Sequence, residues 1–252
     1  MREAVFRFYA ELNDFLPEKN RFRDISLSFP SGQTVKHLIE SCGPPHTEID
    51  LILVNGQPVD FSYQVENNDR VSVFPVFESL DISSIEHLRP SPLRVTRFIL
   101  DCHLGRLAAY LRLLGFDVLY RNDFEDVEIA RISESERRIC ITRDRGLLKR
   151  NQITHGYLVR AEQPRAQVLE IVQRFDLRSQ MNPFTRCSKC NGILSPASIE
   201  DVQAELQPGT LAHFDHFSCC ESCGKVYWKG AHYQRLLNLI EFIRDGVESM
   251  KE

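Results

Sequence analysis

The sequence lacks any long hydrophobic run and any strong excess of charge of one sign. Its longest apolar stretches, such as Leu51-Ile52-Leu53-Val54, fall far short of the roughly 20 residues that a membrane-spanning helix needs. At the N-terminus, charged residues are interleaved with apolar ones (Met1-Arg2-Glu3-Ala4-Val5), whereas a secretory signal needs an unbroken apolar segment. We therefore expect neither a transmembrane helix nor a signal peptide, and we expect a cytoplasmic location.

The formal net charge of −4 argues against a generic polyanion binder, because non-specific affinity for nucleic acids comes mostly from clustered lysine and arginine. Positive charge is nevertheless concentrated in residues 131–150 (RISESERRICITRDRGLLKR). This segment predicts either a local phosphate-binding surface or a solvated helix face. The 252 residues, 42% hydrophobic and 26% charged, suit a globular protein of one large domain or a few small ones.

Residues 1–82 carry the pattern of a small α+β domain. Strands are expected at 5–9 and 25–29, which would pair as a hairpin, then at 50–54 and 71–75, with a helix over 35–42. The turn signal Asn55-Gly56 closes the third strand. The order ββαββ is that of one helix lying across a mixed sheet.

This pattern resembles the ubiquitin-like β-grasp fold, and most closely the sulfur-carrier proteins, which have counterparts of Val54-Asn55-Gly56 and Asn68-Asp69-Arg70-Val71. Sulfur carriers act through a C-terminal Gly-Gly tail, but this sequence contains no two adjacent glycines. Its last strand is also expected to continue through Phe77-Glu78-Ser79 into the next domain. We therefore expect a module that binds or docks a protein partner rather than a sulfur carrier.

A linker is expected at residues 83–93, where two prolines interrupt the periodicity, followed by a second domain at 94–178. Strands and amphipathic helices alternate in this domain, which predicts an α/β fold with a parallel sheet. Strands are expected at 95–100, 117–120 and 138–142, and helices from Leu104 to Leu114 and from Asp126 onward. Gly115 is expected to end the first helix.

Three aspartates follow strands or open a helix in this domain: Asp101, Asp126 and Asp144. In a parallel sheet they would converge on one edge, where their mutual repulsion favours a bound cation such as Mg²⁺ or Mn²⁺. Such an ion activates water and neutralises charge that develops on a phosphodiester, so phosphodiester hydrolysis is the predicted reaction. Aspartates also cap helices for structural reasons, and Asp126 taken alone fits a cap better than a ligand.

Three blocks of sequence carry a family resemblance: FILDCHLGRLA (98–108), YLRLLGFD (110–117) and ITRDR (141–145). They resemble the PIN-like RNase domain named after the C-terminus of the Mut-seven exonuclease, whose bacterial members often carry a ubiquitin-like domain in front and a zinc ribbon behind. The resemblance implies a ribonuclease in which Asp101, Asp126 and Asp144 are catalytic and bind the metal. A further acidic ligand could be Asp117 or Asp123, which leaves open one ion or two.

Four arginines are expected to hold substrate phosphates, because a guanidinium matches phosphate geometry with paired hydrogen bonds: Arg106, Arg112, Arg143 and Arg145. Arg112 could equally be paired structurally with Asp117. His103 could serve as a base beside Asp101, but a lone histidine is more often a packed or surface residue, and we leave it out of the catalytic set.

Five of the eight cysteines fall between residues 187 and 223 and include two CxxC motifs, Cys187 to Cys190 and Cys220 to Cys223. This spacing predicts one structural Zn²⁺ held by four thiolates, since each motif offers two ligands to a tetrahedral ion. The long gap between the motifs predicts a hairpin or loop excursion. A redox pair, which needs only one such motif, is the less favoured interpretation.

Cys219, His213 and His216 are close enough in sequence to replace Cys220 as a ligand. The segment from Cys220 to His232 resembles the closing motif of the family and supports Cys220 and Cys223. Residues 183–252 then form a zinc ribbon and a C-terminal helix. Its aromatic and basic residues predict either an RNA-stacking surface or a small core around the zinc: Tyr227, Trp228, Lys229 and His232.

Two hypotheses follow from these patterns. The first is a cytoplasmic, Mg²⁺- or Mn²⁺-dependent ribonuclease that hydrolyses RNA, such as tRNA or another structured RNA. The second is a non-catalytic RNA- or ribosome-associated adaptor that kept the PIN-like fold. The three intact aspartates favour the first hypothesis.

Overall fold

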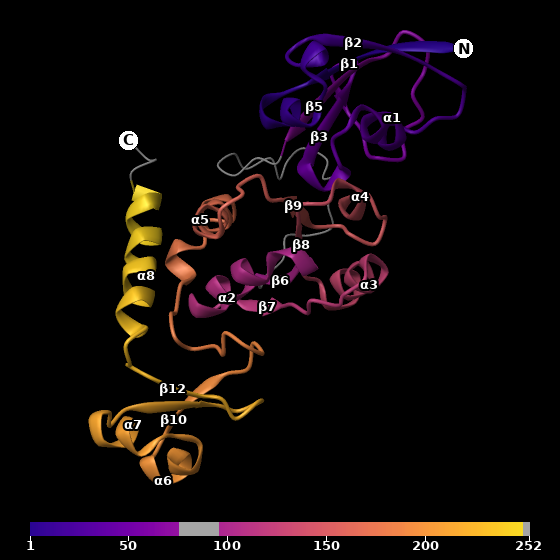
Figure 1. The fold of residues 1–252 in the computed structure, drawn as a ribbon. Helices are drawn as coiled ribbons and strands as arrows, with labels where there is room; N and C mark the ends of the chain where they lie inside the picture. The colour runs from indigo at the N-terminus through magenta and orange to yellow at the C-terminus, as the bar shows by residue number, and fades with distance from the viewer. Residues whose placement is uncertain (76–95, 249–252) are drawn as a thin grey trace. The chain divides into compact units, whose positions relative to one another are not determined.

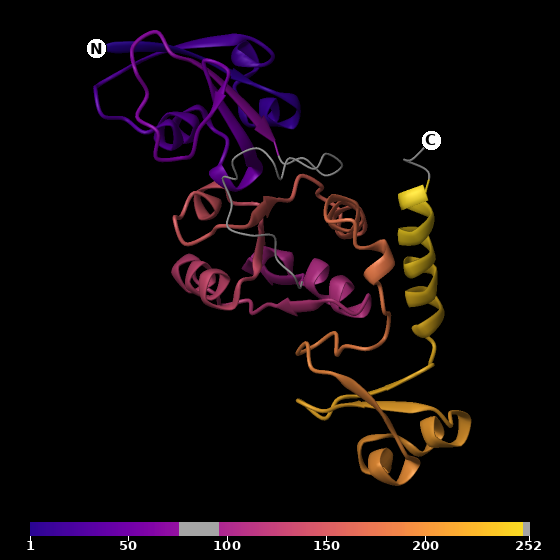
Figure 2. The same ribbon diagram turned by 180° about the vertical axis from the view of Figure 1, so that it is seen from behind.

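The computed structural model describes residues 1–75 and 96–248, which Figures 1 and 2 draw as ribbons from opposite sides. The expected linker at 83–93, the expected domain start at residue 94 and the strand extension at 77–79 lie outside the described residues. Of the helices within the described ranges, none has both the length and the apolarity that crossing a bilayer requires.

The chain divides into two compact units. The first consists of residues 1–94 with 126–158, and the second of residues 95–125 with 159–252. The three strands that the sequence assigns to the PIN-like domain are divided between these units, two in the second and one in the first.

The first unit begins with a five-stranded sheet in the order β2-β1-β5-β3-β4. Its strands are β1 (Arg2–Phe8), β2 (Asp24–Phe29), β3 (Ile49–Val54), β4 (Gln57–Pro58) and β5 (Arg70–Pro75). Helix α1 (Val35–Cys42) packs across this sheet (Figure 1). Because β1 is parallel to β5 but antiparallel to β2, the sheet is mixed, as the sequence predicts. This is the β-grasp arrangement.

The expected pairing of the first two strands is confirmed, with Phe6 opposite Ile25, but their connection is a folded segment rather than a tight turn. It contains two short 3₁₀ helices, η1 (Ala10–Phe15) and η2 (Glu18–Asn20). The buried Asn13 amide satisfies the carbonyls of Phe8 and Ala10, at 3.0 and 2.9 Å. Local polar bonding, which hydrophobic periodicity does not report, therefore shapes this connection.

Other expected local signals are in place. The Thr34 hydroxyl accepts a hydrogen bond from the His37 amide and caps α1. Asn55 and Gly56 have φ values of 51° and 83°, which form the tight turn between β3 and β4.

The first unit also contains α3 (Asp126–Glu136), β8 (Ile139–Thr142), α4 (Arg145–Leu148) and β9 (Gly156–Leu158). The short 3₁₀ helix η3 (His46–Glu48) contacts this segment through buried polar groups. Glu48 Oε1 accepts from the Leu158 amide at 2.8 Å, and His46 Nε2 lies 2.9 Å from the Ile153 carbonyl. The β-grasp domain and the segment from α4 to β9 therefore share a buried polar contact.

The second unit begins with β6 (Arg97–Leu100), η4 (Cys102–Leu104), α2 (Gly105–Leu113) and β7 (Asp117–Leu119). Strands β6 and β7 are parallel, as are β8 and β9, which confirms the predicted parallel sheet. Leu107 and Leu111 of α2 are fully buried because residues four apart share a helix face. Gly115, at φ 96°, ends this helix as expected.

The remaining elements of the second unit are α5 (Pro164–Arg174), η5 (Arg178–Gln180), β10 (Leu194–Ala197), α6 (Ile199–Val202), η6 (Gln203–Glu205), α7 (Pro208–His213), β11 (Phe217–Cys220), β12 (Val226–Trp228) and α8 (Tyr233–Glu248). Strands β10, β11 and β12 form an antiparallel ribbon. The expected excursion between the cysteine motifs contains β10, α6, η6 and α7, and α8 lies beside α5 in both views (Figures 1 and 2).

Gly43 provides a test of the packing between α1 and η1. Its φ is 136°, and a Cβ at this position would clash with the Phe15 carbonyl oxygen. Gly32, with φ 83° and nothing within 4 Å of its Cβ position, is the matched control, for which an alanine should cost about 1–2 kcal/mol. We expect Gly43→Ala to destabilise the β-grasp domain clearly more, as measured by hydrogen exchange of β1 and β5 amides. Equal losses of protection in the two variants would contradict the predicted clash.

Candidate functional site

Asp101 follows directly after β6, whose last three residues, Phe98, Ile99 and Leu100, are fully buried. Its carboxylate accepts a hydrogen bond from the Cys102 amide at 2.6 Å and caps η4. The residue is only 6% exposed. The strand therefore delivers a largely buried carboxylate to its carboxyl end, the position that the sequence predicts for this residue.

Asp126 and Asp144 belong to the first unit. Asp126 opens α3, and its carboxylate lies 3.6 Å from Arg150 Nη2. Asp144 caps α4, accepting from the Gly146 amide at 2.7 Å. Both side chains thus have a local structural role. Because Asp101 lies in the second unit, the grouping of the three carboxylates around one metal stays a prediction.

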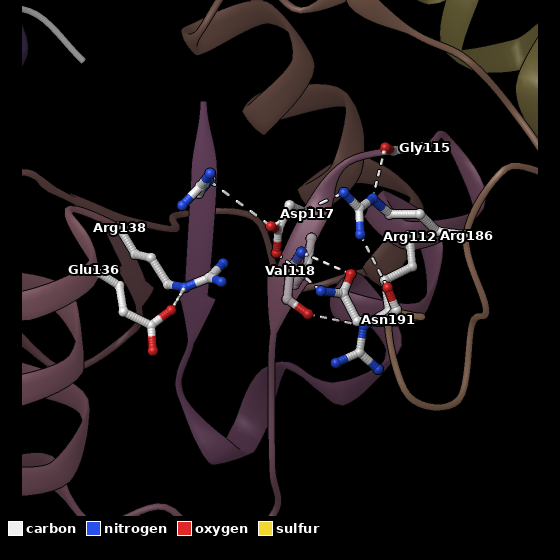
Figure 3. A network of polar contacts seen from close by, with 9 residues as sticks. Arg112, Gly115, Asp117, Val118, Glu136, Arg138, Arg186 and Asn191 are labelled. Carbon is white, nitrogen blue, oxygen red and sulfur yellow. Dashed lines mark hydrogen bonds and ion pairs between the residues drawn. The ribbon is translucent and has the colours of Figure 1, made fainter. Parts of the chain in front are cut away.

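The two candidates for a further acidic ligand have different surroundings. Asp117 Oδ1 accepts from Asn191 Nδ2 at 2.9 Å, and its Oδ2 lies 3.9 Å from both Arg97 Nε and Arg186 Nη2 (Figure 3). Asp123 is exposed, and hydrogen bonds from Arg121 lower the pKa of its carboxyl group. Asp117 is therefore part of a structural network, whereas Asp123 faces solvent. The identity of the further ligand stays a prediction.

Arg112 is a buried residue, 3% exposed, and three backbone carbonyls bind its guanidinium. Its Nε donates to Val118 O at 2.9 Å, and its Nη1 donates to Ser188 O and Lys189 O at 3.3 and 2.9 Å. Burial lowers the pKa of Arg112, against the attraction of the nearby cysteine thiolates and Asp117. A phosphate could bind this guanidinium only after these bonds break, so the geometry suits the structural interpretation of Arg112.

The other three arginines expected at the substrate are exposed: Arg106, Arg143 and Arg145. Arg106 lies in the first turn of α2, close in sequence to Asp101. The guanidinium of Arg145 lies 5.1 Å from the centre of the Phe15 ring and donates to the Phe15 carbonyl at 3.3 Å. His103, which we left out of the catalytic set, is exposed in η4.

Much of the positive charge in residues 131–150 has a structural partner. Arg138 pairs with Glu136 at 2.7 Å, and Lys149 Nζ donates to the Glu40 carbonyl at 2.6 Å. Arg150 pairs with Asp126. These three side chains are engaged in contacts within the fold. Fewer cations of this segment are therefore free to bind phosphates than its number of lysines and arginines suggests.

The four cysteines predicted as metal ligands lie together, with their Sγ atoms all within 4.8 Å of one another: Cys187, Cys190, Cys220 and Cys223. The Sγ atoms of Cys187 and Cys223 are 3.7 Å apart, and those of Cys190 and Cys220 are 3.4 Å apart. A tetrahedral Zn²⁺ with sulfur ligands at about 2.3 Å separates its sulfurs by about 3.8 Å. Spacing and donor chemistry both fit, so this cluster could hold zinc.

The thiols of the cluster are not equivalent. Burial opposes ionisation of Cys187, but hydrogen bonds from Tyr227 Oη, at 3.1 Å, and from the amides of Cys190 and Lys189 lower its pKa to about 6. Burial and the neighbouring cysteines raise the pKa of Cys190 to about 12. A site that already stabilises one thiolate is suited to a cation, because metals bind the deprotonated sulfur.

The alternative ligands point elsewhere. Cys219 Sγ donates to the Gly224 carbonyl at 3.3 Å, His213 Nδ1 lies 2.7 Å from the Gly209 carbonyl, and His216 pairs with Asp215. Cys220, which was the uncertain member, belongs to the cluster with its three partners.

The two interpretations of the aromatic and basic segment apply to different residues. Tyr227 supports the cysteine cluster, because its hydroxyl lies within 3.3 Å of Ser188 Oγ as well as near Cys187. Trp228, by contrast, is 39% exposed, and Lys229 and His232 are exposed beside it in sequence. Tyr227 therefore belongs to the small core, whereas Trp228, Lys229 and His232 are exposed at the surface, with Lys229 over the Tyr233 ring.

Adjacent cysteines test the ligand assignment. Cys220→Ser should lower the bound zinc well below one equivalent, because it removes one of four ligands, whereas Cys219→Ser should retain it, because that thiol lies outside the cluster. Elemental analysis of the purified proteins measures the difference. Zinc loss in the Cys219 variant, or full retention in the Cys220 variant, would contradict the assignment.

Comparison with known proteins agrees with this architecture. Residues 1–81 match the family model of the Mut7-C ubiquitin domain, and residues 96–240 match that of the Mut7-C RNAse domain. No curated protein matches the chain. A solved structure, the putative molybdopterin converting factor, subunit 1 from Pyrococcus furiosus, is 21% identical, with 30% of this chain and 98% of that chain covered and a TM-score of 0.24. Since the RNAse match spans more than half of the 252 residues, the chain belongs to the Mut7-C RNAse domain family and carries a Mut7-C ubiquitin-like domain at its N-terminus.

Proposed function

We propose that this chain is a metal-dependent ribonuclease that hydrolyses RNA phosphodiester bonds at Asp101, Asp126 and Asp144. The observation that carries the proposal is the family match over residues 96–240, within which Asp101 is a largely buried carboxylate at the end of a buried strand. The carboxyl end of a strand in an α/β sheet is where such folds place their ligand-binding side chains.

The donor set fits the proposed metal. Carboxylate oxygens are the hard ligands that Mg²⁺ and Mn²⁺ prefer, in contrast to the sulfur ligands of the cysteine cluster. A bound ion would supply a water of lowered pKa and stabilise charge on the phosphoryl oxygens. Asp101 would hold this ion with Asp126 and Asp144, and their carboxylates would accept hydrogen bonds from the attacking water and orient it.

Substrate phosphates would be held by exposed arginines, above all Arg106 and Arg143, which flank Asp101 and Asp144 in sequence. Arg145 could contribute after release from Phe15. We assign Arg112 to the structure instead, because three carbonyls already bind it.

The outer domains would serve this reaction indirectly. The cysteine ribbon would bind one structural Zn²⁺, and exposed Trp228, Lys229 and His232 would contact RNA, because an aromatic face stacks on bases and a cation attracts phosphate. The ubiquitin-like domain would dock a protein partner. The substrate would be tRNA or another structured RNA in the cytoplasm, where thiols stay reduced and free to bind metal.

One observation favours the alternative of a non-catalytic RNA- or ribosome-associated adaptor. The carboxylates of Asp126 and Asp144 each have a structural role, as the partner of Arg150 and as the cap of α4. In an adaptor these roles alone would account for both residues. Cleavage assays separate the two functions.

The first assay compares wild type with Asp101→Asn and Asp144→Asn on tRNA and single-stranded RNA in Mn²⁺. We expect each variant to lose at least about a hundredfold in kcat, since a metal ligand contributes several kcal/mol to stabilisation of the transition state. Asp215→Asn, at a side chain that is 86% exposed, is the matched control and should cleave normally. If wild type cuts nothing, or the variants cut as well as wild type, the adaptor is the better description.

The second assay measures RNA binding by the inactive Asp101→Asn protein. Adding Arg106→Gln should weaken binding and reduce the salt dependence by about 0.7 in the slope of log K against log salt, the value for one lost phosphate contact on a single strand. Arg121→Gln removes an exposed arginine that pairs with Asp123 and serves as the control. An unchanged slope with the Arg106 variant would exclude this residue from phosphate binding.

A further inference from the structure

Two turns hold the CxxC motifs: the first knuckle, residues 187–192, and the second knuckle, residues 220–225. They share the same backbone hydrogen bonds but differ in the residue that follows the second cysteine. In the first, the Cys187 amide donates to Gly192 O and the Asn191 amide to Cys187 O, at 2.8 and 2.9 Å. In the second, the Cys220 amide donates to Lys225 O and the Gly224 amide to Cys220 O, at 3.0 and 2.9 Å. Asn191 and Gly224 occupy the same position, with φ values of 74° and 69°.

A left-handed residue is what both turns require, and glycine meets that requirement best. The asparagine in the first knuckle therefore needs another explanation. Its side chain lies against the edge strand β7: Oδ1 accepts from the Val118 amide and Nδ2 donates to Asp117 Oδ1, both at 2.9 Å (Figure 3). Its own carbonyl accepts from Arg186 Nη1 at 3.0 Å.

Strand β7 is connected in turn to Asp101. It pairs with β6, with Val118 opposite Phe98, and Asp101 follows β6. The residue after β7, Tyr120, donates its hydroxyl to the Cys102 carbonyl at 2.9 Å, and a Cβ on Gly105 would lie 2.6 Å from that hydroxyl. Tyr120 therefore fixes the backbone immediately beyond Asp101, whose carboxylate accepts from the Cys102 amide.

We propose that Asn191 is a positioning residue that ties the metal-binding knuckle to Asp101 through β7 and Tyr120. With the ion bound, the knuckle holds Asn191 rigid, and two side-chain hydrogen bonds hold the edge of the sheet. Without the ion, the knuckle loosens, and β7 and the Tyr120 contact loosen with it. The importance of Asp101 in this scheme rests on the proposed function, whereas the link from the knuckle to β7 does not.

Gly224→Asn and Asn191→Gly make a matched pair of variants. Asn191→Gly gives the first knuckle the residue of the second and keeps the left-handed turn, and Gly224→Asn adds a side chain where nothing lies within 4 Å of the Cβ position. A third variant, Tyr120→Phe, removes only the hydroxyl that contacts Cys102. All three are made in the full chain loaded with zinc.

We expect Asn191→Gly to keep one equivalent of zinc, because all four cysteines and the turn remain. Amides of residues 117–120 should nevertheless exchange about tenfold faster with deuterium, since two hydrogen bonds are lost. In RNA cleavage with Mn²⁺, Asn191→Gly should have a kcat about tenfold lower than wild type and an unchanged KM. Tyr120→Phe should lower kcat by a similar factor, but the Val118 amide should exchange at the wild-type rate. Gly224→Asn should match wild type, and removal of zinc from wild type should reproduce the faster exchange.

Several results would overturn the proposal. Wild-type exchange at 117–120 in Asn191→Gly, or equal effects of the two knuckle variants, would show that Asn191 holds nothing beyond its own turn. Zinc loss in Asn191→Gly would assign it to metal binding alone. If wild type cleaves no RNA, the proposed function fails, but exchange at 117–120 still decides whether the knuckle holds β7.

Discussion

The buried guanidinium of Arg112 is the contact on which the second unit depends most. It lies near the end of α2, and its three hydrogen bonds run to the strand β7 and to the turn between Cys187 and Cys190. A buried charge is costly unless its donors are satisfied, and here two of the three carbonyls come from residues 76 and 77 positions away in sequence. Helix, edge strand and knuckle must therefore be in place together.

This arrangement also solves an electrostatic problem. Four neighbouring thiols resist ionisation because each thiolate repels the next, and burial adds to the resistance. The guanidinium of Arg112 and the hydroxyl of Tyr227 act in the opposite direction, since both stabilise negative charge on Cys187. The same arginine that joins the knuckle to the sheet thus also favours the thiolate form that a metal needs. A metal held at this cluster would therefore be coupled to the folding of the ribbon.

The aspartates show how similar sequence positions acquire different roles. Asp101, Asp126 and Asp144 all follow a strand or open a helix, and each has a partner, but Asp101 is buried, Asp126 is half-buried and Asp144 is exposed. Asp117, also at a strand, is held by Asn191 and two arginines. These partners, rather than residue type, mark Asp117 as a structural carboxylate.

Local patterns predicted much of this protein. Alternation and helical spacing are short-range properties, so the β-grasp strands, α1, α2 and the start of α3 could be located from sequence, as could the glycine that ends α2. The four clustered cysteines were predicted from the spacing within each CxxC motif, because one tight turn presents both thiolates, and the family resemblance favoured Cys220 over its neighbours. The blocks around Asp101 and Asp144 indicated the family, which the match over residues 96–240 confirms.

Only the tertiary structure decided what the polar side chains do. The sequence alone left Arg112 between phosphate binding and a structural role, and gave no reason to single out Asn191 or the link from Glu48 to β9. The folded 3₁₀ connection after β1 and the short strand β9 were likewise not foreseen. The physical reason is common to all of them. Hydrogen bonds between distant segments depend on which polar groups come close in space, and hydrophobic periodicity along the chain does not specify those partners.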